Sequence, residues 1–289
     1  PFLEYPRILG HELGVEIVEI GPNDRGLKAG DLVSVEPYLN CGECIACRRG
    51  KTNCCTTLKT LGVHTDGGMR EYITLPIRKL HKSDKLSVDQ LALVETLVIG
   101  AHAVRRADPE PGEFLLVIGA GPIGLTVIEA AKASGAEIIV MDINNDRLNF
   151  AQQVLGVEHA VNVADRPLEQ VREITNGDMP TQVYDATGNL QSMNNSFDYV
   201  ASGGKLVFVG LMKENISFND PEFHRREITL YASRNGTASD FKWVIDKVES
   251  GAINTDPWIT HRAPFEQMIG QFNAWLDPAS KVMKALVEL

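Results

Sequence analysis

Hydrophobic residues follow two different patterns along the chain, and the change falls near residue 87. Before it, short segments of strand character lie between turns: Val15–Ile20 places glutamates between β-branched apolar residues, and Leu32–Val35 and Tyr72–Leu75 follow glycine-containing turns. Short segments of this composition, bounded by turns, are typical of strands. We therefore predict an all-β first region, with no helix of any length before about residue 87.

From residue 87 onward, helical patterns alternate with short apolar strands. Ser87 is placed to cap a helix that reaches about Arg106. Helical patterns near residues 122–134, 145–155, 167–175, 189–201 and 221–226 separate six apolar strands, at Phe114–Ile118, Glu137–Met141, Ala160–Val163, Gln182–Asp185, Lys205–Val209 and Ile228–Ala232. Apolar strands that alternate with helices form a parallel sheet covered on both faces. This region predicts an α/β, doubly wound nucleotide-binding domain.

The end of the chain and its length indicate how it is divided. From about residue 236 the pattern is mixed again, with a helix around Phe241–Glu249, a short strand and one more helix before Val282–Leu289. The 289 residues are long for one layered core. We predict three segments: a β-rich segment 1–98, a doubly wound segment 99–235, and a segment 236–289 that returns to the β-rich domain.

Composition and charge exclude several classes of protein. Apolar residues make up 44% of the chain and charged residues 23%, which is typical of a folded globular protein. The net charge of −10 argues against binding to nucleic acid or to an anionic membrane surface. The most apolar stretch, Phe114–Ala131, is interrupted by glycines and a proline and is too short to span a bilayer. No export leader opens the sequence, so we expect a cytoplasmic protein.

All five cysteines lie in one short segment, and their spacing is that of a metal site. The pattern C-x2-C-x2-C-x7-C brings four thiolates onto one loop, and Zn²⁺ takes four such ligands at about 2.3 Å. A disulfide cluster is the alternative, but the odd number of cysteines and the lack of an export signal disfavour it. We predict a structural zinc lobe at 40–56, bound by Cys41, Cys44, Cys47 and Cys55, with Cys54 as a free thiol.

A glycine-rich turn follows the first strand of the doubly wound segment. The sequence from Gly119 to Gly124 is G-x-G-x-x-G, placed between a strand and a helix. Gly119 permits the tight turn, Gly121 lets a pyrophosphate approach the backbone, and Gly124 lets helix and strand pack closely. The helix N-terminus offers free N–H groups and a positive dipole end to phosphates. A tight turn without a ligand is the alternative interpretation.

The residues after the second strand indicate which dinucleotide is bound. Asp142 lies at the end of that strand, where an acid hydrogen-bonds the ribose hydroxyls and repels a 2′-phosphate. No Arg follows it immediately, so NAD is favoured over NADP. Arg147, about one helical turn further on, is either an adenine contact or a solvated surface residue. The predicted cofactor-binding residues are Gly119, Gly121, Pro122, Ile123, Gly124, Asp142, Arg147, Thr187 and Val209.

Together with Gly10-His11-Glu12, these motifs resemble those of zinc-containing medium-chain alcohol dehydrogenases of the sorbitol and polyol dehydrogenase type. The resemblance covers nearly the whole chain: Leu9–Glu12, Gly30-Asp31-x-Val33, the cysteine lobe with Asn53-Cys54-Cys55, Asp66-Gly67-Gly68-x-x-Glu71-Tyr72, Glu95 with Gly100–Val104, Gly119–Gly124, Asp185–Gly188, Gly203–Lys205 and Ser233–Asn235. It implies a Rossmann-type domain beside a β-rich, GroES-like catalytic domain. It also implies a homodimer or homotetramer built through the nucleotide domain.

The resemblance further implies a second zinc, at which the chemistry occurs. His11 matches the histidine ligand, Glu12 the adjacent acid, and Glu95 the acidic position that the polyol branch uses directly or through water. The family's cysteine ligand comes from an upstream segment without a counterpart here, because the sequence starts at Pro1, ten residues before His11. We therefore interpret the chain as lacking its first segment, and expect a catalytic zinc that is weakly bound, partly occupied or absent.

The predicted function is that of a zinc-dependent oxidoreductase that transfers a hydride between NAD and a secondary alcohol, a polyol or a sugar acid. Two alternatives stay open: a zinc-independent quinone or enone reductase of the same superfamily, and a non-catalytic NAD- and zinc-binding fragment. A secondary alcohol, a sugar alcohol, a hexonate and L-threonine all fit as the small-molecule substrate. Of the remaining candidates, we expect His102 to support a helix end or the cofactor loop, His64 to be exposed, and Tyr72 and Phe208 to lie in the core.

Overall fold

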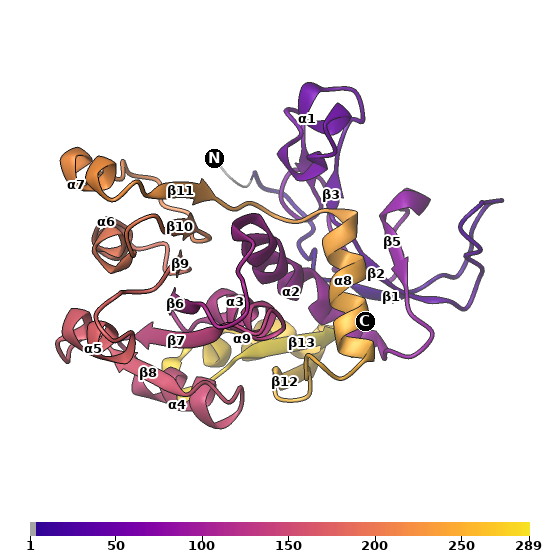
Figure 1. Ribbon diagram of the computed structural model, residues 1–289. Coiled ribbons are helices and arrows are strands. Elements are labelled where there is room, and N and C mark those ends of the chain that lie inside the picture. Colours follow the sequence, from indigo (N-terminus) through magenta and orange to yellow (C-terminus); the bar gives the residue numbers. More distant parts are fainter. Residues whose placement is uncertain (1–3) are drawn as a thin grey trace. The chain divides into compact units, whose positions relative to one another are not determined.

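The computed structural model describes residues 4–289, so the first residues of the sequence, including Pro1, lie outside the described part. The chain forms two compact units. One contains the residues up to Val98 together with Asn235–Leu289, and the other contains Ile99–Arg234. The long helix α2 (Val88–Ala107) contributes residues to both units (Figure 1).

The unit Ile99–Arg234 is built on a six-stranded parallel sheet in the order β11-β10-β9-β6-β7-β8. This is the order of a doubly wound sheet, with its reversal between β6 and β9. Its strands are β6 (Phe114–Ile118), β7 (Glu137–Asp142), β8 (His159–Asn162), β9 (Gln182–Asp185), β10 (Lys205–Phe208) and β11 (Thr229–Ala232). All six predicted strands are present, with ends that differ from the prediction by a residue at most.

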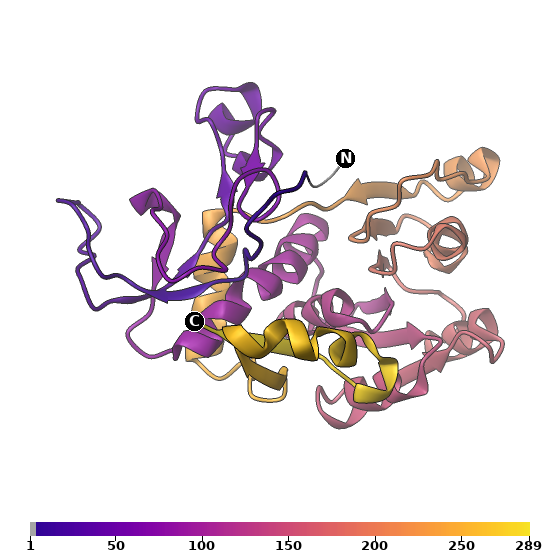
Figure 2. The same cartoon turned by 180° about the vertical axis from the view of Figure 1, so that it is seen from behind.

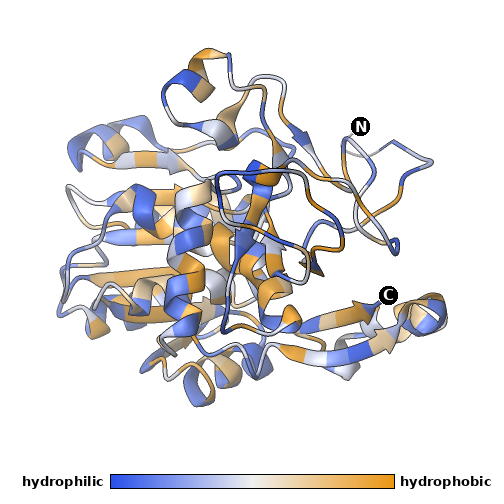
Figure 3. Cartoon of the chain, turned by 90° about the vertical axis from the view of Figure 1, so that its right-hand side faces the viewer, coloured by the Kyte–Doolittle hydropathy of each residue, from blue (hydrophilic) through white to orange (hydrophobic). Residues whose placement is uncertain are grey.

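The central strands are buried on both faces, which explains their continuous apolar sequences. Neighbouring residues of β6, Leu115 and Leu116, point to opposite faces and are both fully buried. Figure 3 shows the same contrast, with apolar strands and more polar connecting helices. The helices are α3 (Pro122–Lys132), α4 (Asn145–Gln153), α5 (Pro167–Ile174), α6 (Leu190–Asn195) and α7 (Asp220–Arg225). The helix predicted at 189–201 is divided into α6 and a 3-10 segment, Ser196–Tyr199.

The other unit contains an antiparallel sheet, β1-β2-β5, formed by β1 (Gly14–Glu16), β2 (Leu32–Val35) and β5 (Leu80–Lys82). A two-stranded ladder, β3 (Tyr38–Leu39) with β4 (Lys59–Thr60), encloses the cysteine segment. That segment holds a single helical turn, α1 (Ile45–Arg48), and a 3-10 turn at Thr52–Cys54; another 3-10 turn, Ile77–Lys79, precedes β5. A small apolar core supports the sheet, with Ile17, Leu27, Val33, Val35, Leu61 and Leu80 buried.

Four predictions for this region were wrong in detail. Strand β1 ends at Glu16 because its partner β2 begins only at Leu32, so most of Val15–Ile20 has no ladder. Residues 72–75 form no strand, since they pair with no other described segment, and Tyr72 is 70% exposed rather than in the core. The turn α1 is a helix before residue 87, and it fits the tight loop that the cysteines require.

The C-terminal residues complete this unit. They form α8 (Ala238–Glu249), β12 (Ile259–Pro264), α9 (Phe265–Leu276), a 3-10 turn at Pro278–Ser280 and β13 (Lys284–Glu288). Strands β12 and β13 pair in parallel, and α9 packs along them (Figure 2). The start of α2 is capped as predicted: the Gln90 N–H donates to the Ser87 hydroxyl at 3.3 Å, and the Ser87 N–H donates to the Gln90 side chain at 3.0 Å.

Candidate functional site

The four cysteines of the predicted zinc lobe lie together at one end of the β3–β4 ladder. The sulfur atoms of Cys41, Cys44, Cys47 and Cys55 all lie within 4.8 Å of one another. The Sγ atom of Cys41 is 3.5 Å from that of Cys55 and 4.0 Å from that of Cys47. Four sulfurs at about 2.3 Å from one zinc ion are about 3.8 Å apart, so this spacing fits a tetrahedral site.

Backbone N–H groups stabilise the thiolate forms of two of the four cysteines, whereas burial raises the pKa of Cys47. The pKa of Cys44 is lowered to about 5, chiefly by the N–H groups of Cys47 and Thr56. The N–H of Cys41 lowers the pKa of Cys55 in the same way, at a distance of 3.3 Å. All five cysteines are unpaired thiols, and Cys54 is exposed and stands outside the cluster. The donor set therefore suits zinc and contains no disulfide.

His11, Glu12 and Glu95 form a second cluster, with ligand atoms within 4.8 Å of one another. His11 follows Gly10, whose carbonyl accepts a hydrogen bond from the Gly68 N–H at 2.9 Å. The two segments approach so closely that a Cβ on Gly67 would lie 2.2 Å from the Gly10 oxygen. The Gly67-Gly68 pair thus lets the loop press against the segment that carries His11, while α2 supplies Glu95.

The two carboxylates of this cluster differ in their exposure to solvent. Glu95 is only 3% exposed, and burial, with the nearby charge of Glu12, raises its pKa to about 7. Glu12 is exposed and forms an ion pair with Lys284 of β13. Burial lowers the pKa of His11, which favours the neutral imidazole that ligates metals. An imidazole and two carboxylates, one of them buried, are a donor set that fits zinc and gains from a cation.

The predicted cofactor loop occupies the turn between β6 and α3. Gly119 has a φ of +97°, a conformation that side chains with a Cβ rarely adopt. A Cβ on Gly124 would lie 1.7 Å from the Gly119 oxygen, whereas a Cβ on Gly121 would meet only the Arg147 guanidinium, at 3.7 Å. Gly121 is the N-cap of α3 and provides no side chain to its free N–H groups. The turn therefore leaves room for a ligand at Gly121 but none at Gly124.

The other predicted cofactor residues gather around this loop at the carboxyl ends of the strands. The Asp142 carboxylate accepts hydrogen bonds from the Ala120 N–H at 2.7 Å and the Asn144 N–H at 2.8 Å. The Arg147 guanidinium is 4.0 Å from the same carboxylate. Thr187 donates to the buried Asp185 at the end of β9, and the Val209 N–H donates to the Asp185 carbonyl at 2.9 Å. Pro122 and Ile123 form the first turn of α3.

Two residues that sequence reasoning missed contact the second cluster. The Tyr38 hydroxyl of β3 donates to Glu95, and Lys284 pairs with Glu12. Neither belongs to a motif, although a lysine inside an apolar C-terminal strand is a weak signal. Of the remaining candidates, His64 is exposed as expected, and His102 is buried on α2 beside Arg105. Phe208 is half-buried and packs on Phe197.

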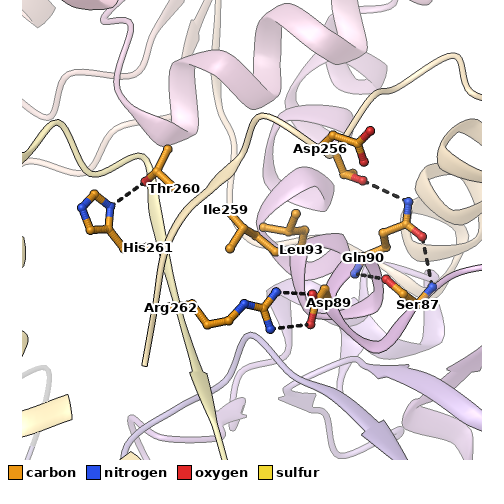
Figure 4. A pocket seen from close by; sticks show the side chains of 10 residues that line it. Ser87, Asp89, Gln90, Leu93, Asp256, Ile259, Thr260, His261 and Arg262 are labelled. Carbon is orange, nitrogen blue, oxygen red and sulfur yellow. Dashed lines mark hydrogen bonds and ion pairs between the residues drawn. The ribbon is translucent and has the colours of Figure 1, made fainter. Parts of the chain in front are cut away.

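Two hollows lie in the unit that holds the metal clusters. A groove of about 1680 Å³ runs along β1 and β13, and His11, Glu12 and Lys284 are among its lining residues. A smaller pocket of about 440 Å³ lies at the start of α2, where the Arg262 guanidinium pairs with Asp89 (Figure 4). None of the predicted ligand or cofactor residues lines the smaller pocket. No helix among residues 4–289 is long and apolar enough to cross a membrane.

Comparison with known proteins places these features in one family. The sequence matches the alcohol dehydrogenase GroES-like domain over residues 1–85 and zinc-binding dehydrogenases over residues 122–250. It is 44% identical to the L-galactonate-5-dehydrogenase of Escherichia coli K12, over 92% of this chain and 78% of that one. It is 33% identical to the sorbitol dehydrogenase of Bacillus subtilis 168, over 99% of this chain and 82% of that one. The structure of an alcohol dehydrogenase of Escherichia coli CFT073, solved with NADH, is also similar. It superposes with a TM-score of 0.91 at 29% sequence identity, and the match covers 99% of this chain and 85% of that one.

The fold and the two clusters thus define a dinucleotide-dependent dehydrogenase with a GroES-like domain. The chain belongs to the zinc-binding medium-chain alcohol dehydrogenases. The predicted family and fold class are confirmed, as is the prediction of an NAD-dependent alcohol or polyol dehydrogenase with zinc as a second cofactor. The alternative of a zinc-independent quinone or enone reductase is not favoured.

Proposed function

We propose that this protein oxidises a secondary hydroxyl group of a sugar acid or polyol with NAD, at the cluster of His11, Glu12 and Glu95. The observation that carries the proposal is the gathering of these three ligands, one of them a buried carboxylate, within 4.8 Å. The names of the relatives, L-galactonate-5-dehydrogenase and sorbitol dehydrogenase, support this substrate class. In this proposal residues 1–98 and 236–289 form the catalytic domain, and residues 99–235 bind the dinucleotide.

Each residue of the cluster has a distinct role in the proposed mechanism. The neutral imidazole of His11 and the carboxylate of Glu95 would hold the catalytic zinc, and Glu12 would ligate it or adjust the charge beside it. When bound, zinc acts as a Lewis acid that makes a substrate hydroxyl easier to deprotonate. Lys284 restrains the Glu12 carboxylate through its ion pair. The cysteine lobe, closed by four sulfurs, has a structural role.

The parallel-sheet unit binds and orients the dinucleotide. The N–H groups at the start of α3 and the bare backbone of Gly121 would receive the pyrophosphate, and Asp142 would accept hydrogen bonds from the ribose hydroxyls. Arg147, whose guanidinium is 4.0 Å from Asp142, would contact the adenine. When bound, NAD would supply the nicotinamide carbon that accepts the hydride. Thr187 lies against Gly119 of the loop, and Val209 is hydrogen-bonded to Asp185 beside it; both would restrict where the nicotinamide ring lies.

A substrate panel tests this proposal. L-galactonate, further hexonates, sorbitol and L-threonine are offered with NAD or NADP, and NADH formation is followed by absorbance. We expect turnover of a hexonate or polyol with NAD, abolished in His11→Ala and retained in the control His64→Ala, whose side chain is exposed. A His11→Ala protein as active as the wild type would contradict the assignment of the site.

We also propose that the protein is a cytoplasmic homodimer or homotetramer associated through its parallel-sheet unit. The family resemblance supports this, and so does β11, an edge strand whose Leu230 is 39% exposed. Sedimentation equilibrium measures the assembly directly. A concentration-independent monomer would refute the proposal.

A further inference from the structure

A buried hydrogen bond joins the metal cluster to a residue that the proposed mechanism does not use. The hydroxyl of Tyr38 donates to Oε1 of Glu95, across a sequence separation of 57 residues. Tyr38 is 2% exposed and Glu95 is 3% exposed, so water does not compete for this bond. A carboxylate offers about four acceptor positions. Donation by Tyr38 therefore fixes the orientation of the carboxylate and leaves it able to bind a cation.

The position of Tyr38 in the chain connects this bond to the cysteine lobe. Tyr38 pairs with Thr60, and Leu39 with Lys59, in the β3–β4 ladder. All four zinc-lobe cysteines lie on the chain between these two strands. The next residue, Asn40, donates its side-chain N–H to Cys47 Sγ at 3.6 Å. The ladder that carries the Tyr38 side chain is thus the base of the lobe.

Buried side chains hold the ring of Tyr38 in place. Phe241 of α8, which is fully buried, contacts it edge to face with ring centres 6.4 Å apart. Phe241 also stacks on His81, with ring centres 4.8 Å apart, and His81 Nε2 lies 3.3 Å from a carboxylate oxygen of Glu36. Glu36 is itself paired with the buried Lys79. A ring fixed in this way has little freedom to withdraw its hydroxyl from Glu95.

We propose that Tyr38 is a positioning residue, which orients Glu95 for the catalytic metal and transmits the folded state of the cysteine lobe to that metal site. The inference rests on the proposed function, in which His11, Glu12 and Glu95 hold zinc. The order of the lobe fixes the β3–β4 ladder, the ladder fixes Tyr38, and Tyr38 fixes the carboxylate. Loss of the lobe therefore weakens metal binding at a site to which the lobe supplies no ligand.

The first test compares Tyr38→Phe with a matched control, Tyr184→Phe. Both changes remove one buried tyrosine hydroxyl, and that of Tyr184 donates to Gln182 at 2.6 Å in the other unit. Zinc retained per chain is measured by elemental analysis during titration with a chelator, with melting temperature as a check on folding. We expect Tyr38→Phe to lose the non-lobe zinc at about ten-fold lower chelator concentration than the wild type. The Tyr184→Phe protein keeps it.

The second test is a double-mutant cycle. Cys47→Ser, which removes a lobe ligand, is expected to weaken the non-lobe zinc in the wild-type background and to add no further loss in Tyr38→Phe. Where Cys47→Ser prevents folding of the lobe unit, Asn40→Ala provides a milder comparison, since it removes only the amide that contacts Cys47. Equal zinc retention in Tyr38→Phe and Tyr184→Phe would overturn the positioning role.

The remaining outcomes separate this inference from the proposed function. Equal losses caused by the lobe variant in both backgrounds would overturn transmission through Tyr38. A wild-type protein that retains lobe zinc alone at every chelator concentration would overturn both the proposed function and this inference. Retention of both zinc ions by the wild type and by Tyr38→Phe alike leaves the proposed function standing and refutes the inference alone.

Discussion

Two glycines of the cofactor loop make different contacts, so their replacement by alanine separates folding from binding. A Cβ on Gly124 would lie 1.7 Å from the Gly119 oxygen and 2.8 Å from its carbonyl carbon. Because both are backbone atoms, the strand or the helix must move by roughly 1 Å or more to accommodate a methyl group. We expect Gly124→Ala to cost about 3 kcal/mol, a fall of roughly 10 °C in melting temperature.

Gly121→Ala introduces the same methyl group where the protein itself leaves space. Gly121 has a φ of −75°, and its Cβ would contact only Arg147, at an ordinary distance of 3.7 Å. Loss of a favoured N-cap glycine costs about 0.5–1 kcal/mol, and restriction of the unfolded chain offsets this by a similar amount. The melting temperature should therefore stay within about 2 °C of the wild type. NADH affinity should fall at least ten-fold, or about 1.4 kcal/mol, because the methyl group occupies the path of the pyrophosphate.

Fluorescence titration with NADH and thermal melting followed by circular dichroism measure the two effects. Gly21→Ala is the matched control, since nothing lies within 4 Å of its Cβ and its φ is not positive. It should change neither quantity. A Gly121→Ala protein that binds NADH as tightly as the wild type would refute the assignment of the loop. A Gly124→Ala protein with the same melting temperature as Gly21→Ala would refute the packing argument.

Three further predictions concern other residues. Asp142→Ala should reduce the preference for NAD over NADP by about ten-fold in kcat/KM, since the repelling carboxylate is lost; an unmutated protein that prefers NADP would contradict this. Cys55→Ser should lower the melting temperature of the cysteine-containing unit and remove one zinc, with Cys54→Ser as the unaffected control, because binding energy at a structural zinc site is folding energy. Burial on α3 raises the pKa of Glu129 above its ordinary value of 4.5. The contribution of protonated Glu129 to the free energy of unfolding is therefore fully present below pH 4.5 and is lost as pH rises through the higher pKa of the folded state. Glu129→Gln should thus flatten the decline of melting temperature above pH 4.5; an unchanged pH profile would show that another group titrates.

The sequence was most informative where local pattern and tertiary role coincide. The six strands of the parallel sheet are buried on both faces, so each appears as a continuous apolar run, and all six were predicted. The glycine loop and the cysteine quartet could also be predicted, because each motif lies within a short segment and its geometry is mainly local. The helix start at Ser87 also follows from a cap that neighbouring residues complete.

The β-rich unit was less predictable, because its structure depends on pairing between distant segments. Val15–Ile20 has the β-branched composition of a strand, yet only the part opposite β2 forms a ladder. Residues 72–75 have strand composition without a partner, and Tyr72 is exposed. Strand formation in such sheets is decided by the neighbour and not by the segment itself.

The family resemblance proposed the cluster of His11, Glu12 and Glu95. Without it, no local pattern in the sequence relates His11 to Glu95, because they are 84 residues apart. The sequence by itself determined the parallel sheet, the glycine turn and the cysteine quartet, since hydrogen-bond geometry and ligand spacing act over a few residues. Only the tertiary structure decided that Tyr38 reaches Glu95 and that Lys284 reaches Glu12. These contacts join Tyr38 of β3 to Glu95 of α2 and Lys284 of β13 to Glu12, and such long-range contacts leave no periodic pattern in either partner segment.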